Sequence, residues 1–229
     1  MKILNLIVAR SNSKRLKNKN MLLINRKPII DYTIEFSKKI TSNNLILLST
    51  DSKKILERGK KKKILCPWLR PKYLSSDQAN LVDVSIHAIK WYEKNIDSVD
   101  ALLLLQSSSP FRNVKSVNQG VKAFKQDTNK TIISMSSSTK HPRWNFRIKN
   151  NLLYPYYKGL KFNYNDQLSS SENIYMPNGN FYIISKKKLF KEKSFYKGKL
   201  KPIVLSNLRE CIDIDTLHDL DYAKFLNSR

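Results

Sequence analysis

The sequence has little cysteine and no long hydrophobic run, and both shortages exclude classes of protein. Its two cysteines, Cys66 and Cys211, are far apart and form no CxxC motif, which argues against a disulfide framework and a cysteine-ligated zinc site. No stretch approaches the roughly 20 apolar residues that a membrane helix needs. The first apolar run, residues 3–9, is too short for a signal peptide. We therefore expect a soluble protein of the reducing cytoplasm, with no membrane insertion.

Glycine is also scarce, with 5 residues in a chain of 229. Many phosphate-binding loops are glycine-rich, because backbone N–H groups must approach the anion closely. A phosphate site in this protein would instead depend on side-chain donors.

Acidic residues are few: 18 Asp and Glu face 43 Lys and Arg, which gives a formal net charge of +25. Such a surplus attracts anions, so nucleic acid is the first partner to consider and a nucleotide substrate the second. However, the lysines are scattered among much Asn, Ile and Tyr, as in a compositionally biased genome, and no known nucleic-acid module is present. The lysine run 60–63 is typical of a solvated helix end. A basic nucleic-acid-binding protein is thus the less favoured alternative.

Short apolar runs alternate with helix-like segments along the chain. The runs 3–9, 45–50, 101–106 and 131–136 predict buried strands. The segments between them that predict helices are 28–40, 52–61, 80–95 and 113–126. This alternation predicts an α/β protein with a doubly wound, mostly parallel sheet.

The length suits one domain, 1–229, with an excursion at about 139–180 that is rich in aromatic and turn residues. We expect the excursion to be irregular or antiparallel, and suited to covering a site or forming an interface between subunits. Residues 180–185 then predict another core strand, and about 216–227 a last helix.

Three polar stretches carry the candidate chemistry, since ligands of open parallel sheets bind beyond the carboxyl ends of the strands. The first is the loop "RSNSKRLKNKN", residues 10–20. Converging cations and polar groups here could hold a triphosphate and stabilise a leaving pyrophosphate. The residues concerned are Arg10, Ser13, Lys14, Lys19 and Asn20. The alternative is one more solvated basic patch.

The second stretch is "LLLLQSSSPFR", residues 102–112. Gln106 ends a very apolar strand and should face the site, although an ordinary strand-to-helix turn is the alternative. The third is "CIDIDTLHDLDYA", residues 211–223. Asp213 and Asp215 would point to the same side of an extended backbone and could hold Mg²⁺. The alternative is helix N-capping by Asp215 or Thr216.

Together these stretches resemble the CMP-N-acetylneuraminate (CMP-sialic acid) synthetase, or acylneuraminate cytidylyltransferase, family. Residues 7–20 are similar to its opening A-R-x-x-S-K-x-x-x-x-K-N signature. The further blocks that resemble the family, in the same order, are "STD" (49–51), "RPKYLSSDQA" (70–79), "LLQSSSPFR" (104–112), "PNGNFYI" (177–183) and "DIDTLHDL" (213–220). The resemblance covers nearly the whole chain.

The resemblance implies a Rossmann-like fold with an inserted dimerisation segment, and a Mg²⁺-dependent transfer from CTP to an acidic nine-carbon sugar. It implies catalytic roles for Arg10, Lys19 and Asp215. It implies CTP binding by Arg10, Ser13, Lys14, Asn20, Arg70, Ser76 and Ala79. Sugar binding would involve Gln106, Asn178 and Tyr182, and Asp213 and Asp215 would hold the metal. The product would serve lipopolysaccharide or capsule synthesis.

The chain departs from the family pattern in three places. Arg15 and Lys17 stand where many relatives have Gly and Pro, and we expect both to be background charge. Met176 replaces a frequently basic residue, so Lys140, His141 or Arg143 would meet the sugar carboxylate. "HPRW" (141–144) lacks a final Lys. The same chemistry on legionaminic, pseudaminic or 3-deoxy-octulosonic acid is the alternative, the last less favoured because Lys14-Arg15 replaces its usual Thr-Arg.

Overall fold

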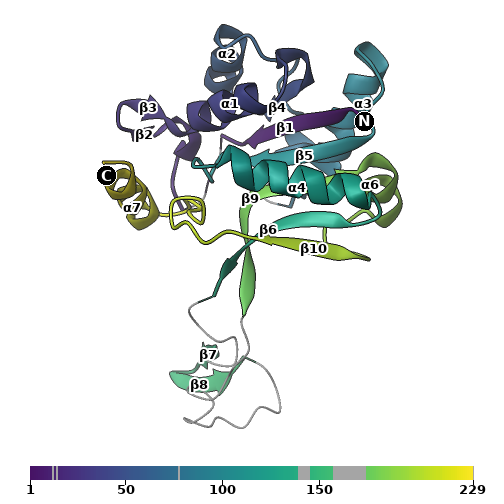
Figure 1. Ribbon diagram of the computed structural model, residues 1–229. Helices are drawn as coiled ribbons and strands as arrows, with labels where there is room; N and C mark the ends of the chain where they lie inside the picture. Colours follow the sequence, from purple (N-terminus) through teal and green to yellow (C-terminus); the bar gives the residue numbers. More distant parts are fainter. Residues whose placement is uncertain (12, 14, 77, 139–144, 157–173, 229) are drawn as a thin grey trace.

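A six-stranded sheet forms the centre of the molecule in a computed structural model, which describes residues 1–229 except 12, 14, 77, 139–144, 157–173 and 229 (Figure 1). The strand order is β10-β6-β9-β5-β1-β4. The strands are β1 (Ile3–Ala9), β4 (Ile46–Thr50), β5 (Ala101–Gln106), β6 (Thr131–Ser137), β9 (Tyr175–Ser185) and β10 (Leu200–Val204). Neighbouring strands are parallel except where β9 pairs with β5 and β6. The predicted α/β fold with a mostly parallel sheet is confirmed.

The uninterrupted apolar strands arise because both faces of the sheet are covered. In β5, Leu102 and Leu104 belong to one core cluster, whereas Leu103 and Leu105 belong to another on the opposite face. Alternate side chains of a strand point to opposite faces, so a strand buried on both sides must be apolar throughout.

Helices cover both faces of this sheet (Figure 1). The first face packs against α3 (Leu81–Asn95) and α6 (Lys186–Glu192). The second packs against α1 (Ile29–Ile40) and α4 (Val114–Gln126), which lie in front of the sheet in Figure 1. At the β4 edge lies α2 (Lys53–Lys61). The last helix, α7 (Leu217–Ser228), packs on the hairpin β2 (Leu23–Ile24) and β3 (Lys27–Pro28).

Several details differ from the sequence-based predictions. Pro28 was expected in the first helix, but it pairs with Leu23 in β3 and precedes the first helical residue. The strand β10 was not predicted, because its alternating pattern around Lys201 and Pro202 lacks an apolar run. The strand β9 begins at Tyr175, five residues before the predicted start at 180.

The reversed direction of β9 affects the site. Its amino-terminal part lies at the same edge of the sheet as the carboxyl ends of the parallel strands, because it runs antiparallel to β5 and β6. Residues 177–180, which were assigned to the excursion, therefore lie at the sheet edge where α/β proteins bind ligands.

The described part of the excursion is antiparallel, one of the two forms expected. The ends of β6 and β9 extend away from the sheet as a ribbon, and the hairpin of β7 (Phe146–Lys149) and β8 (Leu152–Pro155) lies beyond it (Figure 1). We call this hairpin the arm. Its apolar side chains are strongly exposed, with Ile148 at 76% and Leu153 at 66%.

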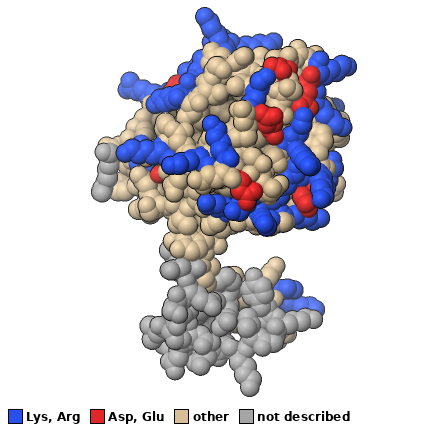
Figure 2. All heavy atoms as spheres, turned by 45° about the vertical axis from the view of Figure 1, so that its right-hand side comes forward, with Lys and Arg blue, Asp and Glu red and all other residues tan. Residues whose placement is uncertain are grey.

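The surface charge is spread rather than concentrated. On the face that Figure 2 shows, Lys and Arg side chains are distributed over the body with acidic side chains among them. Among the described residues, no helix is both long and apolar enough to span a bilayer. Both cysteines are free thiols.

Candidate active site

A cavity of about 390 Å³ opens at the carboxyl ends of β1 and β5. β4 lies on one side of β1 and β5 on the other, so the strand order reverses at this point, which is where open α/β sheets bind their ligands. Predicted site residues that line the cavity are Arg10, Lys19, Asn20, Arg70, Ser76, Ala79, Gln106, Asp213 and Asp215. Segments from four parts of the sequence thus meet at one place.

Asn20 fixes the opening loop against the end of β5. Its Nδ2 donates to the backbone carbonyl of Arg10 at 2.9 Å, and its Oδ1 lies 2.6 Å from the Ser107 hydroxyl oxygen. The Ser107 hydroxyl also lies 2.9 Å from the carbonyl of Val8 in β1. Asn20 is 3% exposed, and these bonds hold the backbone of Arg10 at the rim of the cavity, which Asn20 also lines. Sequence reasoning had not singled out Ser107 for this contact.

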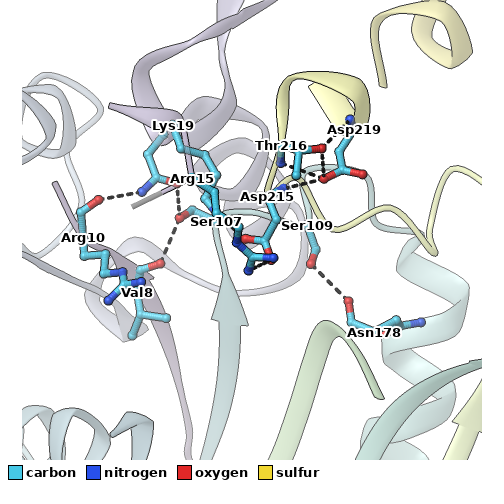
Figure 3. Close-up of polar contacts among 11 residues, drawn as sticks. Val8, Arg10, Arg15, Lys19, Ser107, Ser109, Asn178, Asp215, Thr216 and Asp219 are labelled. Atoms are coloured by element: carbon cyan, nitrogen blue, oxygen red, sulfur yellow. Dashed lines mark hydrogen bonds and ion pairs between the residues drawn. The ribbon is translucent and has the colours of Figure 1, made fainter. Parts of the chain in front are cut away.

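Asp215 pairs with two cations of the opening loop (Figure 3). Lys19 Nζ lies 2.8 Å from Oδ1, and the Arg15 guanidinium contacts Oδ2. The Lys19 side chain is 13% exposed, whereas that of Arg15 is 66% exposed. Arg15 was expected to be background charge, and the structure gives its side chain a specific partner in a candidate catalytic residue. No motif in the sequence could have shown a contact that depends on the fold.

The backbone around Asp215 is held by Asp219. Its Oδ2 accepts hydrogen bonds from the backbone N–H groups of Asp215 and Thr216 and from the Thr216 hydroxyl, at 2.7–2.9 Å (Figure 3). Burial raises the pKa of Asp219, but these bonds outweigh it and leave the pKa lowered. Asp219 thus satisfies backbone N–H groups at the start of α7, where capping by Asp215 or Thr216 was expected. The Asp215 carboxylate does not serve as this acceptor and faces the opening loop instead.

Asp213 lies between the cavity and the start of β9. Partial burial raises its pKa, and the neighbouring charge of Asp215 adds to that effect, whereas Ser108 and Lys19 oppose it. Gly179 is adjacent: a Cβ atom there would lie 3.5 Å from Asp213 Oδ2 and 3.2 Å from the Ser109 hydroxyl oxygen. Gly179 also has a φ of +73°, which favours glycine.

Asp51 connects the opening loop with Arg70 on another side of the cavity. Its two carboxylate oxygens accept from the Ser11 backbone N–H at 2.6 Å and the Ser11 hydroxyl at 2.7 Å. Arg70 forms an ion pair with the same carboxylate at 3.7 Å. Burial lowers the pKa of Arg70, and the charge of Arg10 lowers it further, while Asp51 opposes both. Asp51 lies in the "STD" block, but its role was not predicted.

Arg112 lies behind the cavity rather than in it. Its guanidinium donates to the backbone carbonyls of Gln106 and Asn180 and to the Thr33 hydroxyl. Burial lowers its pKa to about 9, with Asp213 opposing the shift, so the side chain is still cationic at neutral pH. Arg112 thereby connects β5, β9 and α1 beneath the site.

The remaining predicted residues either do not line this cavity or lie outside the described residues. Ser13 is in the opening loop but does not line the cavity, and Lys14 lies outside the described residues, as do Lys140, His141 and Arg143. Asn178 lines a neighbouring cavity. The Tyr182 hydroxyl pairs with that of Tyr196 at 3.0 Å, and its ring packs on Phe195. Tyr182 is 4% exposed and lies within β9, opposite Leu104 of β5, and it lines neither this cavity nor the neighbouring one.

The donor set suits a polyphosphate bound near a divalent cation. Arg10, Lys19 and Arg15 can contact phosphate oxygens, and Asp213 and Asp215 are hard oxygen ligands within one cavity. Burial is the main cause of the raised pKa of Asp213, and the nearby charge of Asp215 adds to it, so a bound divalent cation would offset both effects. The residues present therefore fit Mg²⁺.

Comparison with known proteins agrees with this chemistry. Residues 4–224 match the family described as Cytidylyltransferase. The chain is 34% identical to CMP-N,N'-diacetyllegionaminic acid synthase of Legionella pneumophila, over 97% of this chain and 94% of that protein. It is 29% identical to pseudaminic acid cytidylyltransferase of Campylobacter jejuni, over 99% and 96%. It is also 29% identical to N-acylneuraminate cytidylyltransferase of Streptococcus agalactiae, over 96% of this chain but 52% of that protein.

A solved structure with a similar fold is that of CMP:2-keto-3-deoxy-manno-octonic acid synthetase complexed with CTP. The TM-score is 0.69 at 14% identity, and the match covers 100% of this chain and 99% of the other. This likeness supports the fold.

Proposed function

Because the chain belongs to the cytidylyltransferase family, we propose that it activates a nonulosonic, sialic-type acid with CTP. The products would be the CMP-sugar and pyrophosphate, for the synthesis of a cell-surface glycan. The observation that carries this proposal is the match over residues 4–224, and the candidate site adds a cavity where cations and two carboxylates meet. The protein is accordingly a nucleotidyltransferase, as the sequence predicted.

In the proposed reaction the anomeric hydroxyl of the sugar acid attacks the α-phosphorus of CTP. One P–O bond forms, the bond to the β-phosphate oxygen breaks, and the hydroxyl proton passes to solvent. Such transfers require positioning and charge neutralisation more than covalent catalysis. Arg10 and Lys19 would neutralise the leaving pyrophosphate, and Asn20 would hold Arg10 in place through its carbonyl.

The nucleoside would occupy the part of the cavity lined by Arg70, Ser76 and Ala79, and the sugar acid the part beside Gln106. Asp213 and Asp215 would hold Mg²⁺. When bound, the ion would polarise the α-phosphate and acidify the attacking hydroxyl. Without substrate, Lys19 forms an ion pair with Asp215. When CTP and Mg²⁺ bind, Asp215 would hold the ion, and Lys19 would turn to the phosphate.

The sugar acid belongs to a small group. The relatives named above act on diacetyllegionaminic, pseudaminic or N-acylneuraminic acid, which share an acidic nine-carbon skeleton. A legionaminic or a pseudaminic acid is therefore the alternative to a sialic acid as the substrate of the same reaction. The comparisons do not favour nucleic acid, and the dispersed surface charge in Figure 2 offers no single docking face on the side shown.

The arm would form the interface of a homodimer. Its exposed side chains Ile148, Leu152, Leu153 and Tyr154 are all at least 48% exposed in the isolated chain. Exposed apolar patches of this kind commonly mark a protein interface. We place the enzyme in the cytoplasm, where CTP is available and both thiols stay reduced.

A single assay tests the proposal. The protein is incubated with CTP, MgCl₂ and a panel of nonulosonic acids, and pyrophosphate release is measured. Turnover should require both the sugar acid and CTP, and EDTA should abolish it. Absence of pyrophosphate with every acid, together with salt-sensitive binding of DNA or RNA, would instead favour a nucleic-acid-binding protein.

A further inference from the structure

A second cavity, of about 350 Å³, adjoins the catalytic one, and we call it the side cavity. Asp213 lines both cavities, so a sugar acid near that carboxylate can extend into the second space. The strand β9 forms one wall through Met176, Pro177 and Asn178, and the segment before α7 forms the opposite wall.

The walls of the side cavity are mainly apolar. Met176, Leu208, Ile212 and Tyr222 contribute thioether, aliphatic and aromatic surface. Three of these are large side chains that stay exposed in the isolated chain: Met176 at 52%, Leu208 at 63% and Tyr222 at 45%. Apolar surface left open beside the Asp213 carboxylate favours an apolar part of a substrate.

The charges at the side cavity have the opposite sign to the rest of the protein. Among its described lining residues, Asp213 and Asp219 are the charged ones, although the chain as a whole carries +25. A sugar carboxylate would meet repulsion here, because two like charges in a partly desolvated space disfavour each other. The carboxylate must therefore point elsewhere, and the side cavity suits an uncharged substituent.

One buried donor in the wall has no acceptor. Asn178 is 5% exposed, and its Oδ1 accepts from the Ser134 hydroxyl and from the Asn180 backbone N–H. Since a backbone N–H can only donate, this bond identifies the other end of the amide as the NH₂ group. That Nδ2 has no partner among the described residues. A buried donor without a partner destabilises a protein unless something else supplies an acceptor.

We propose that the side cavity holds an N-acylamino substituent of the sugar acid and makes the enzyme selective for it. The acyl methyl would pack against Met176, Leu208 and Tyr222, and the acyl oxygen would accept from Asn178. This rests on the proposed function and goes further, because it assigns the residues that distinguish one acylated sugar acid from another.

The test compares three sugar acids that differ at one acyl group: N-formyl, N-acetyl and N-glycolyl. These lack the methyl, carry it, or add a hydroxyl to it. We expect kcat/KM to be about 10-fold higher for the N-acetyl acid than for either analogue, the usual effect of one methyl or hydroxyl in an apolar pocket. Met176→Gln should reduce that preference to less than about 3-fold, while KM for CTP stays unchanged.

Leu200→Gln is the matched control, since Leu200 is 44% exposed but lies in β10 and does not line either cavity. It should keep the full preference. An unchanged preference in Met176→Gln would overturn the proposal, and so would an equal loss of activity toward all three acids. A change of oligomeric state without a change of preference would instead assign the surface to a second copy of the chain. Failure of the proposed function would look different, because the wild-type protein would then release no pyrophosphate with any acid.

Discussion

Lys19 Nζ lies 2.8 Å from Asp215 Oδ1, although 196 residues separate the two in the sequence. This contact joins the opening loop to the segment before α7 across the end of the sheet. It places a cation suited to pyrophosphate beside a carboxylate suited to a metal. Neither stretch forms a site alone, and the geometry of the sheet brings them together.

Asp215→Asn should lower turnover by at least ~10²-fold, by analogy with the loss of one key electrostatic group in other enzymes. The amide keeps the size of the side chain but removes the charge that pairs with Lys19 and would hold Mg²⁺. Pyrophosphate release measured against MgCl₂ concentration checks this. Asp221→Asn is the control, because Asp221 is on the neighbouring helix and pairs only with Lys224 among the described residues. Full activity of Asp215→Asn would contradict the assignment of the carboxylate.

Arg15→Ala should raise KM for CTP and weaken product inhibition by pyrophosphate, each by about 10-fold, which is the effect of one lost charge-assisted bond. The reason is that the exposed guanidinium beside Asp215 can turn to the terminal phosphates. Lys17→Ala removes the same charge from the same loop and should change both constants by less than about 2-fold, as expected of an exposed charge. Equal changes of the two constants in Arg15→Ala and Lys17→Ala would show that Arg15, like Lys17, has no specific role in binding CTP. Inhibition by CMP serves as an internal reference.

Asp51→Asn should mainly raise KM for CTP, because Asp51 positions Ser11, next to Arg10, and pairs with Arg70. Of its two oxygens only one remains an acceptor in the amide, so one bond to Ser11 is lost. Ser11→Ala removes the hydroxyl bond alone. The double variant should be little worse than Asp51→Asn, since residues in direct contact are not additive. Strict additivity, or a fall in kcat without any change in KM, would exclude this positioning role.

The sequence predicted the architecture well because strand and helix signals are local. The apolar run Leu102–Leu105 predicts a strand covered on both faces, and the structure confirms it. The reversed strand β9 is different: "NFYIIS" predicts a core strand, but its direction depends on the path of the excursion. The sequence therefore indicated Asn178 as a site residue only through the family resemblance.

The site was predictable where residues follow a parallel strand, as with Arg10 and Gln106. The site was not predictable where residues distant in the sequence come into contact only in the folded protein. Tyr182 alternates with Phe181 along β9, and the two point to opposite faces, so the buried Tyr182 ring directs its hydroxyl toward that of Tyr196, which is 53% exposed. Arg15 and Lys17 are equally cationic in the sequence, and only the position of Asp215 distinguishes them.

Replacing Ile148 and Leu153 by Asp together should convert a dimer into monomers. The two residues pair across β7 and β8, so both changes fall on one face of the arm, and burying two carboxylates in an apolar interface is strongly unfavourable. Sedimentation velocity gives the oligomeric state. Leu217→Asp is the control, since Leu217 is 62% exposed but belongs to α7. A wild-type protein that is already monomeric at micromolar concentration would refute the proposed interface.

Gly179→Ala and Gly198→Ala separate backbone strain from an effect on the site. Both glycines have positive φ, +73° and +69°, so each substitution should destabilise the fold by about 1–2 kcal/mol. For a chain of this length that lowers Tm by roughly 2–8 °C. The surroundings differ: a Cβ at Gly179 meets Ser109, Gln106 and Asp213, whereas one at Gly198 meets only the flexible end of Lys188.

Both variants should therefore show a similar loss of Tm, but only Gly179→Ala should lower kcat/KM, by about 10-fold or more, because a sub-ångström displacement of site groups is costly to catalysis. Thermal unfolding and pyrophosphate release on the same preparations give the two numbers. Equal activity of the two variants would mean that the close approach of β9 to Asp213 serves packing alone. Unequal activity would show that the reversed strand, through a residue with no side chain, sets the position of the Asp213 carboxylate.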